Sequence, residues 1–284
     1  MLEDIITNND YSYDKDNWKM KKREQLKNAY NMIDEAVEEL KSNPQFFKSY
    51  LDVQSRFDRY TIRNALLLTK QFPQVRQLKD YNSWKELNAY FKNKYPNKVI
   101  ILEPGDQYVN KEGKKVTPYN TKEMIDISET DLKPSVKNYD KQLILQALIH
   151  KNGIKIEPVE NLENSQMYNW DKEQNVIYIC KTDDYDAAIS SLASALAKVN
   201  LYEEVGEISE EKAECIGYMI CKKYNVEMSI DNIEKLTDMF DGKDNKQIKD
   251  ELSAMKSVLE NINNRMEQYL DKKVRNSRDK DMER

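Results

Sequence analysis

The spacing of apolar residues predicts that helices dominate the first half of the chain. Residues 17–41 place apolar side chains at alternating steps of four and three, which is the period of an amphipathic helix. Three more helices are expected before Pro96, and they cover residues 44–53, 61–71 and 82–95. Short strands at 99–102 and 124–127, with a loop or β-ribbon between them, complete this half.

The hydrophobic period changes after Lys133-Pro134-Ser135, and we place a domain boundary there. A helix at 139–150 is followed by three strand-length apolar or alternating segments, which we expect to form an antiparallel sheet: 154–159, 166–170 and 176–180. Two further helices are expected at 183–200 and 209–224. Ser209 is a good N-cap for the second of them, because its hydroxyl can accept from a free backbone N–H.

The last helix is expected at 245–273. Its apolar residues keep a strict four-three spacing: Ile248, Leu252, Met255, Leu259, Ile262, Met266 and Tyr269. Such a seam either packs on its own domain, which we favour, or joins two copies into a homodimer. The charged tail from Asn276 to Arg284 is expected to be disordered.

These patterns together predict an α+β fold. We expect a helix-rich N-terminal domain with a small β-sheet (1–135), a domain with an antiparallel sheet and helices (136–241), and a long C-terminal helix with its tail (242–284).

Composition narrows the class of protein. Of the 284 residues only 39% are apolar, 33% are charged and 6 are glycine, which is typical of a helix-rich, well-solvated chain. No apolar run approaches the ~18 residues of a membrane span, and the acidic N-terminus does not resemble a secretory signal. The three cysteines, Cys180, Cys215 and Cys221, show no C-x-x-C spacing and are expected to be reduced thiols. We therefore expect a cytoplasmic protein without a membrane partner.

Basic and aromatic residues are concentrated between residues 53 and 102, which carry ten basic, three acidic and eight aromatic side chains. Cations can follow the phosphates of a single strand while exposed rings stack on unpaired bases, so this stretch suits single-strand binding. The same composition arises when a helix exposes its charges and buries its rings, and composition alone does not separate the two. Residues 136–230, with ten basic and sixteen acidic side chains, should meet a different partner.

The order of residues favours the first interpretation. A set of motifs occurs in a fixed order along this stretch: Tyr60-Thr61-Ile62-Arg63-Asn64 before a run of leucines, Gln71-Phe72-Pro73, Trp84-Lys85, a strand ending in Pro104, and Asp126-Ile127-Ser128-Glu129-Thr130. This order resembles the N-terminal domain of the ArdC-type antirestriction proteins and their LtrC-like relatives. The resemblance implies binding of single-stranded DNA. We assign that contact to Arg56, Arg59, Tyr60, Arg63, Asn64, Lys70, Gln71, Arg76, Trp84, Lys85, Tyr90, Lys92, Lys94 and Lys98.

The same relatives continue into a zincin-like metallopeptidase domain, marked by H-E-L-A-H on a helix and a downstream glutamate ligand. Its two imidazoles lie four residues apart on one helix face and hold zinc, while the intervening glutamate deprotonates the metal-bound water. In this chain Ser190 and Ser194 stand at the two ligand positions and Ser191 at the position of the base, and Glu214 keeps the third ligand.

Neutral hydroxyls are poor zinc ligands, and the whole chain has one histidine, His150, so no alignment can restore the motif. We therefore predict a pseudo-metallopeptidase domain with no catalytic residue, no metal and no cofactor. The serines should instead form a small-residue face that lets a neighbouring element approach closely.

Two catalytic alternatives remain weaker. A serine hydrolase using His150 lacks the strained turn that exposes such a nucleophile. A zinc site made of His150 and the three cysteines fails because Cys215 and Cys221, six residues apart on one helix, face different directions.

The sequence therefore predicts a non-enzymatic, single-stranded-DNA-binding accessory protein with a dead metallopeptidase-like domain that serves as a scaffold or partner-binding surface. The resemblance implies an antirestriction or conjugation role on a plasmid or conjugative transposon, with a conjugation or restriction-system protein as a further partner. The second hypothesis is a protein-interaction module that acts through the acidic C-terminal domain and its last helix, without nucleic-acid binding.

Overall fold

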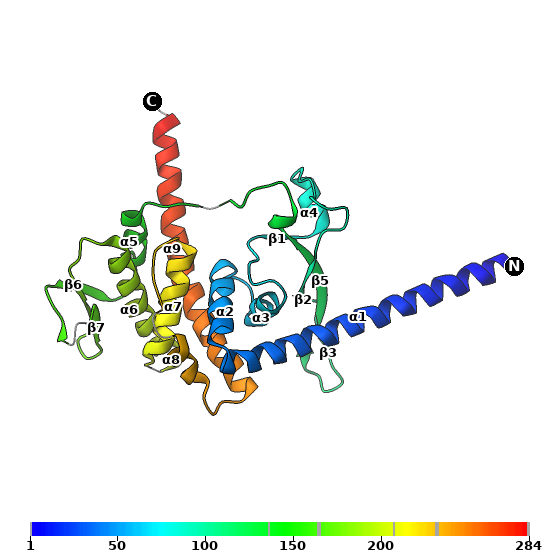
Figure 1. The fold of residues 1–284 in the computed structure, drawn as a ribbon, viewed down its shortest axis with the longest axis horizontal. Coiled ribbons are helices and arrows are strands. Elements are labelled where there is room, and N and C mark those ends of the chain that lie inside the picture. Colours follow the sequence, from blue (N-terminus) through cyan, green and yellow to red (C-terminus); the bar gives the residue numbers. More distant parts are fainter. Residues whose placement is uncertain (1, 136, 164–165, 207, 231–232, 283–284) are drawn as a thin grey trace. The chain divides into compact units, whose positions relative to one another are not determined.

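A computed structural model of the chain describes residues 2–135, 137–163, 166–206, 208–230 and 233–282, with side chains from residue 17 to residue 275 (Figure 1). The chain forms two compact units. Unit 1 comprises Met1–Glu38 and Leu66–Pro134, and unit 2 comprises Glu39–Ala65 and Ser135–Arg284. Both combine helices with a small sheet, so the predicted α+β class is confirmed.

Unit 1 is built on a three-stranded antiparallel sheet in the order β1-β5-β2. Its strands are β1 (Leu78–Lys79), β2 (Val99–Pro104) and β5 (Tyr119–Asp126). The stretch between β2 and β5 contains the expected ribbon, with β3 (Tyr108–Val109) antiparallel to β4 (Lys115–Val116). Helix α1 (Leu2–Ser42) packs on this sheet, because the Thr121 hydroxyl donates to Gln25 Oε1 at 2.6 Å.

The helix expected at 82–95 is much shorter than predicted, since α4 runs only over Tyr81–Glu86. Asn88 adopts a left-handed backbone with φ of 56°, and a residue in that conformation ends a helix. The chain after it pairs with a distant segment instead, through Phe91 and Thr130. This tertiary pairing is not visible in the local periodicity.

Unit 2 is a helical layer packed on a second sheet. Its helices are α2 (Pro44–Arg56), α5 (Lys141–Ile149), α6 (Tyr185–Val205), α7 (Glu210–Lys223), α8 (Ile233–Thr237) and α9 (Asn245–Met282). Helix α3 (Ile62–Gln71) begins in this unit and ends in unit 1. Helices α6 and α7 lie side by side (Figure 1), and Ser209 caps α7 as predicted, accepting from the Lys212 N–H.

The second sheet has the order β6-β8-β7 and is mixed, where an antiparallel sheet was expected. Strand β6 (Lys155–Val159) runs parallel to β8 (Val176–Cys180), and β7 (Tyr168–Asp171) runs antiparallel to it. The three predicted strands all exist. The error arose because the apolar alternation of a short strand does not encode the direction of its neighbour.

The apolar seam of α9 faces its own unit. Six of its seven residues are at most 1% exposed: Ile248, Leu252, Met255, Leu259, Ile262 and Met266. They pack against α5, α6 and α7. Because these apolar side chains are buried within their own unit, they cannot form the apolar contact of a homodimer through residues 245–273. Tyr269 is half-buried and bonds to Gln146 at 3.1 Å. The backbone stays helical to Met282, where a disordered tail from Asn276 was expected.

The two units differ from the expected domains at residues 39–65, which were assigned to the N-terminal domain but belong to unit 2. Helix α2 packs against α7 and α8, and the Tyr218 hydroxyl donates to Asp52 at 2.7 Å. Contacts with residues more than 150 positions downstream decide this assignment. No helix within the described ranges is long and apolar enough to cross a membrane.

Candidate functional site

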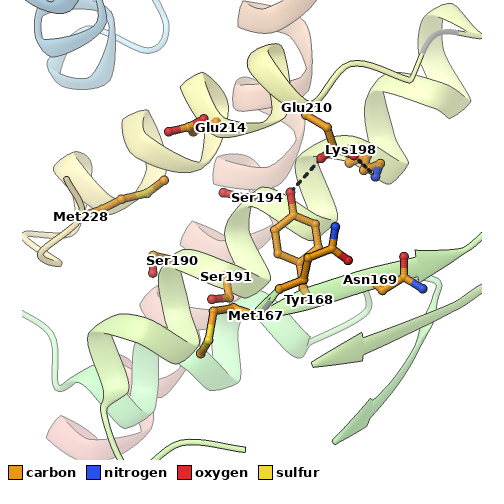
Figure 2. A pocket seen from close by; sticks show the side chains of 11 residues that line it. Met167, Tyr168, Asn169, Ser190, Ser191, Ser194, Lys198, Glu210, Glu214 and Met228 are labelled. Carbon is orange, nitrogen blue, oxygen red and sulfur yellow. Dashed lines mark hydrogen bonds and ion pairs between the residues drawn. The ribbon is translucent and has the colours of Figure 1, made fainter. Parts of the chain in front are cut away.

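The three serines that the sequence analysis placed at the zincin ligand and base positions line a cavity of about 390 Å³ in unit 2 (Figure 2). Ser190, Ser191 and Ser194 come from α6, and Glu214 faces them from α7. The start of β7 and the loop after α7 close the cavity, and the remaining lining residues are Gln166, Met167, Tyr168, Asn169, Lys198, Glu210 and Met228. The structure therefore brings all four residues of the predicted degenerate metal site together.

Small residues let α6 and α7 come close at this point, as predicted for the serine face. A Cβ atom added to Gly217 on α7 would lie 2.3 Å from the Ser194 Oγ and 3.0 Å from its backbone nitrogen. Such distances leave no room for a side chain, so the glycine is required for this packing. Ser191 is 9% exposed and Ser194 is 5% exposed, which places both hydroxyls at the floor of the cavity.

Three charged side chains line the cavity. Glu210 forms an ion pair with Lys198 and accepts a hydrogen bond of 3.2 Å from the Tyr168 hydroxyl. Burial raises the pKa of Tyr168 above its ordinary value, and the negative charges of Glu210 and Glu214 raise that pKa further. The phenol is therefore neutral at physiological pH and acts as a donor to Glu210.

The donor set does not fit the metal of a zincin. The lining offers serine hydroxyls and no imidazole, and of its two carboxylates Glu210 is paired with Lys198, so the set lacks the ligands that a zincin uses to hold a divalent ion. In the described ranges no group of three or more His, Cys, Asp or Glu side chains could hold a metal ion.

His150 and the three cysteines, which the two weaker catalytic alternatives need, do not line the serine cavity. His150 caps the end of α5 and its ring lies 4.7 Å from that of Tyr269, and it does not line the serine cavity. Burial raises the pKa of Cys215, with Glu214 adding to the effect, and burial raises the pKa of Cys221 to about 12. Both thiols are therefore protonated at neutral pH, and a protonated thiol is a poor nucleophile.

The predicted DNA contacts fall into two groups, one in each unit. In unit 1 the segment 89–98, which we call the platform segment, carries Tyr90, Lys92 and Lys94. The Tyr90 ring is 76% exposed, and Tyr95, which was not among the predicted contacts, is 81% exposed. Lys85 on the preceding helix α4 lies 4.8 Å from the Tyr81 ring. Exposed rings and cations therefore occur within one short stretch.

The platform segment is held by the segment that follows β5. The Tyr90 N–H donates to Asp131 Oδ1 at 2.9 Å, and the Asp131 N–H donates back to the Tyr90 carbonyl at 3.0 Å. The Lys92 ammonium donates to the Ser128 carbonyl at 2.8 Å, and Asn97 bonds to Glu129 through its backbone and its side chain. The exposed rings thus stand on a fixed backbone.

Two of the residues predicted to contact DNA from unit 1 have structural roles instead. The Trp84 ring is 0% exposed and its Nε1–H donates to the Ile125 carbonyl at 2.9 Å, so it cannot stack on a base and that prediction is wrong. Gln71 bonds to both backbone groups of Ile100, at 2.8 and 2.9 Å. Of the other cations, Lys98 pairs with Glu123 at 2.6 Å, Arg76 is exposed and Lys70 is half-buried.

The second group of predicted contacts lies in residues 56–64, within unit 2. Arg59 pairs with Glu267 of α9 at 2.5 Å, and that contact raises its pKa. Asn64 is 7% exposed. Tyr60 is half-buried with its ring 5.1 Å from Phe57, while Arg56 and Arg63 are exposed. The structure therefore does not bring the fourteen predicted contact residues together in one unit.

Comparison with known proteins identifies the fold. No family model and no curated protein matches the chain. Among solved structures, the metal-free antirestriction protein ArdC of plasmid R388 matches over 74% of this chain and 86% of its own, with 13% identity and a TM-score of 0.48. Its Mn(II)-bound structure matches over 84% of this chain and 97% of its own, with 11% identity and a TM-score of 0.52. The chain has the ArdC fold.

The likeness to ArdC is one of architecture, because so low an identity does not show that the two proteins share individual side chains. It confirms the resemblance read from the residue order and the fold class. The R388 protein has a Mn(II)-bound structure, whereas the serine cavity here has a ligand set unsuited to a divalent metal.

Several cavity residues were missed by sequence reasoning. Tyr168 comes from β7 and Met228 from the loop after α7, and only the fold brings these two to the serines. Part of the signal was available: Lys198 follows Ser194 by four residues and Glu210 precedes Glu214 by four, so each pair shares a helix face.

Proposed function

We propose that this chain is a non-catalytic, single-stranded-DNA-binding accessory protein of a mobile genetic element, acting in the cytoplasm in an antirestriction role like that named for the ArdC protein of R388. The ArdC fold supports the setting. Unit 1 carries the DNA contact through the platform segment. The serine cavity of unit 2 is a vestige of a metallopeptidase site and performs no hydrolysis.

The observation that carries this proposal is the exposed Tyr90 ring on a backbone fixed by Asp131. A backbone that is already fixed loses little further freedom when a base stacks on the ring it carries, so more of the stacking energy appears as affinity. Lys92 and Lys94 lie within four residues of that ring and can follow the adjacent phosphates.

Titration of the full chain with a fluorescent oligo-dT at several salt concentrations tests the DNA contact. We expect the affinity to fall with salt at a log-log slope of about 0.7 per phosphate contacted. The double reversal Lys92→Glu/Lys94→Glu should weaken binding at low salt by roughly tenfold or more and flatten the slope by about 1.4. The matched control is Lys246→Glu/Lys272→Glu on α9, where both side chains are exposed and the net charge changes equally. Equal losses in the two variants would point to a net-charge effect and contradict a local contact.

Metal analysis of the purified chain tests the second part. We expect no bound zinc or manganese in the wild-type protein. In the variant Ser190→His/Ser194→His two imidazoles join Glu214, and we expect about one equivalent of zinc. Adding Glu214→Gln to that variant should abolish zinc binding, whereas Glu203→Gln, on an exposed position of α6, should not. Zinc in the wild-type protein would overturn the proposal that this site is degenerate.

A further inference from the structure

The charges on helix α1 are segregated along its length. Residues 17–28, which we call the basic half of α1, carry five basic side chains and one acidic side chain, whereas residues 29–42 carry one basic and four acidic side chains. A helix that uses charge for solubility alone commonly mixes the two signs, and pairs at i and i+4 then stabilise it. The basic half therefore has a net charge of +4 that its own sequence does not neutralise.

Three cations of the basic half are exposed without an ion pair. Lys21, Arg23 and Lys27 are exposed, and none of them has a hydrogen-bond or ion-pair partner in the part of the chain that the structure describes. Arg23 and Lys27 are four residues apart and share one helix face. Exposed cations that no carboxylate pairs attract an anionic partner.

An exposed ring accompanies these cations. Trp18 is 61% exposed and precedes Lys21 by three residues and Lys22 by four, so the three side chains share one face of α1. The other two tryptophans, Trp84 and Trp170, are at most 8% exposed. An exposed ring beside cations is the combination that binds an unpaired base together with its phosphate.

The basic half of α1 lies next to the platform segment. The Lys22 ammonium donates to the Thr121 carbonyl at 3.4 Å, which holds the helix against β5. Two positions further along that strand, the pKa of Glu123 is lowered first by the hydrogen bond and charge of Lys98 and then by the charge of Lys22. Lys98 is the last residue of the platform segment, so the two basic stretches meet at one carboxylate.

We infer that the basic half of α1 is a second contact for single-stranded DNA, and that a strand bound at the platform segment continues along this helix. Lys21, Arg23 and Lys27 hold its phosphates, and the Trp18 ring stacks on one of its bases. This contact deepens the proposed function and rests on it. It makes a long single strand the substrate, since the platform segment alone covers few nucleotides.

A membrane surface is another anionic partner that a basic helix can meet. An interfacial helix buries one continuous apolar face among the lipids. The exposed large apolar side chains of the basic half, Trp18 and Met20, are two residues apart and lie about 160° from each other around the helix. They cannot enter a bilayer together, and the position of the ring among cations favours nucleic acid.

Titration of the full chain with fluorescent oligo-dT of two lengths, about 8 and about 25 nucleotides, tests the inference. The wild type should bind the longer strand about tenfold more tightly or better. Arg23→Glu/Lys27→Glu should weaken binding of the longer strand roughly tenfold and of the shorter strand less than about twofold. The matched control Lys246→Glu/Lys272→Glu changes the net charge equally on exposed positions of α9 and should alter either affinity less than about twofold.

Acrylamide quenching of tryptophan fluorescence gives a readout that does not depend on the charge reversals. Because Trp84 and Trp170 are buried, the quencher acts mainly on Trp18. The longer strand should lower the quenching constant about twofold or more, and the shorter strand, which the platform segment accommodates, should leave it unchanged. In Trp18→Phe this protection should disappear while the affinity for the longer strand stays within about threefold, because the remaining ring still stacks.

The outcomes separate this inference from the proposed function. Binding of both lengths that Lys92→Glu/Lys94→Glu weakens and Arg23→Glu/Lys27→Glu leaves unchanged would overturn the inference and support the proposed function. Absence of binding at either length would overturn both. Vesicles of phosphatidylcholine and phosphatidylserine test the membrane surface. Vesicle binding that is lost in Arg23→Glu/Lys27→Glu, with unchanged oligo-dT affinity, would assign the basic half of α1 to lipid and overturn the inference.

Discussion

Lys92 and Lys94 in unit 1 and Arg59 in unit 2 come from the same basic, aromatic-rich stretch of sequence, but their surroundings differ. The first two are exposed beside exposed tyrosine rings. Arg59 is paired with Glu267, a residue of α9 more than 200 positions downstream. The local composition is equal in the two places, so the role of a cation is decided by the carboxylates that tertiary structure brings to it.

The surroundings of Arg59 extend into a buried network. Lys223 pairs with Asp58 and with Glu267, the latter at 2.7 Å, and Asn263 donates to Asp58 at 2.9 Å. The network joins the end of α2 to α7 and α9. A cation in this position stabilises unit 2 and has its charge balanced, whereas Lys94 on the platform segment is exposed to solvent.

The largest expected effect contrasts the two aromatic side chains that the sequence treats alike, Trp84 and Tyr90. Trp84→Ala removes a fully buried ring and its hydrogen bond to the Ile125 carbonyl, and should destabilise unit 1 by about 3–5 kcal/mol. Tyr90→Ala removes an exposed ring and should cost less than about 1 kcal/mol. Urea unfolding followed by circular dichroism measures both.

Oligo-dT affinity gives the opposite order for the same pair of variants. Tyr90→Ala should lose about 1–3 kcal/mol of binding if its ring stacks on a base. At temperatures where Trp84→Ala is still folded, that variant should bind as the wild type does. Equal stability losses for the two variants would contradict the placement of Trp84 in the core and of Tyr90 on the surface.

A second prediction concerns the buried network of unit 2. Lys223→Met leaves Asp58 and Glu267 without their shared cation, and we expect a loss of about 2–3 kcal/mol, because one partner of a largely buried pair is removed. Lys94→Met on the platform segment should stay within about 0.5 kcal/mol of the wild type. Denaturant midpoints of the two variants at pH 7 make the comparison, and similar midpoints would contradict it.

A third prediction separates DNA binding from stability at Arg59 itself. Arg59→Gln breaks a pair whose arginine side chain is 68% exposed, so the stability loss should be about 0–1 kcal/mol. Its charge is already balanced by Glu267, and oligo-dT affinity should change less than about twofold. A loss of oligo-dT affinity comparable with that of Lys92→Glu/Lys94→Glu would show that Arg59 contacts the DNA.

The elements that sequence reasoning predicted well are those whose signals are local. The seam of α9 and the Ser209 cap of α7 follow from spacing and from capping chemistry, and both are present. The helix over 82–95 failed because the left-handed Asn88 and the pairing of Phe91 with Thr130 are set by contacts beyond the window. The direction of β6 failed for the same reason, since pairing is a property of two segments.

The residues of the candidate site likewise comprise some that local spacing predicts and others that only tertiary structure brings in. Helical spacing was enough to group Ser190 with Ser194 on α6, and they line one cavity. The residues that give the cavity its chemistry, Tyr168 and Met228, are contributed by the sheet and by a loop, and no period in the sequence connects them to the serines. Residues 39–65 show the limit most clearly, because they begin in the last turn of α1 and yet belong to unit 2, where α2 packs on α7.

The smallest expected effect is the pH dependence of the network around Glu267. Burial alone would raise the pKa of Glu267, but hydrogen bonds from Lys223 and Arg59, together with their charges, outweigh burial and leave this pKa below its ordinary value. A carboxyl whose pKa is depressed by folding stabilises the protein above its unfolded-state pKa and loses that contribution as the pH falls through its folded-state pKa.

Glu267→Gln should therefore be less stable than the wild type at pH 7, and the two stability curves should converge as the pH falls below about 4. The wild type and Glu203→Gln, whose exposed carboxyl lies outside the network, should keep a constant difference over the same range. Urea midpoints measured from pH 7 to pH 3 test this prediction. A stability difference between the wild type and Glu267→Gln that persists at pH 3 would mean that Glu267 stabilises unit 2 by packing and not by its charge.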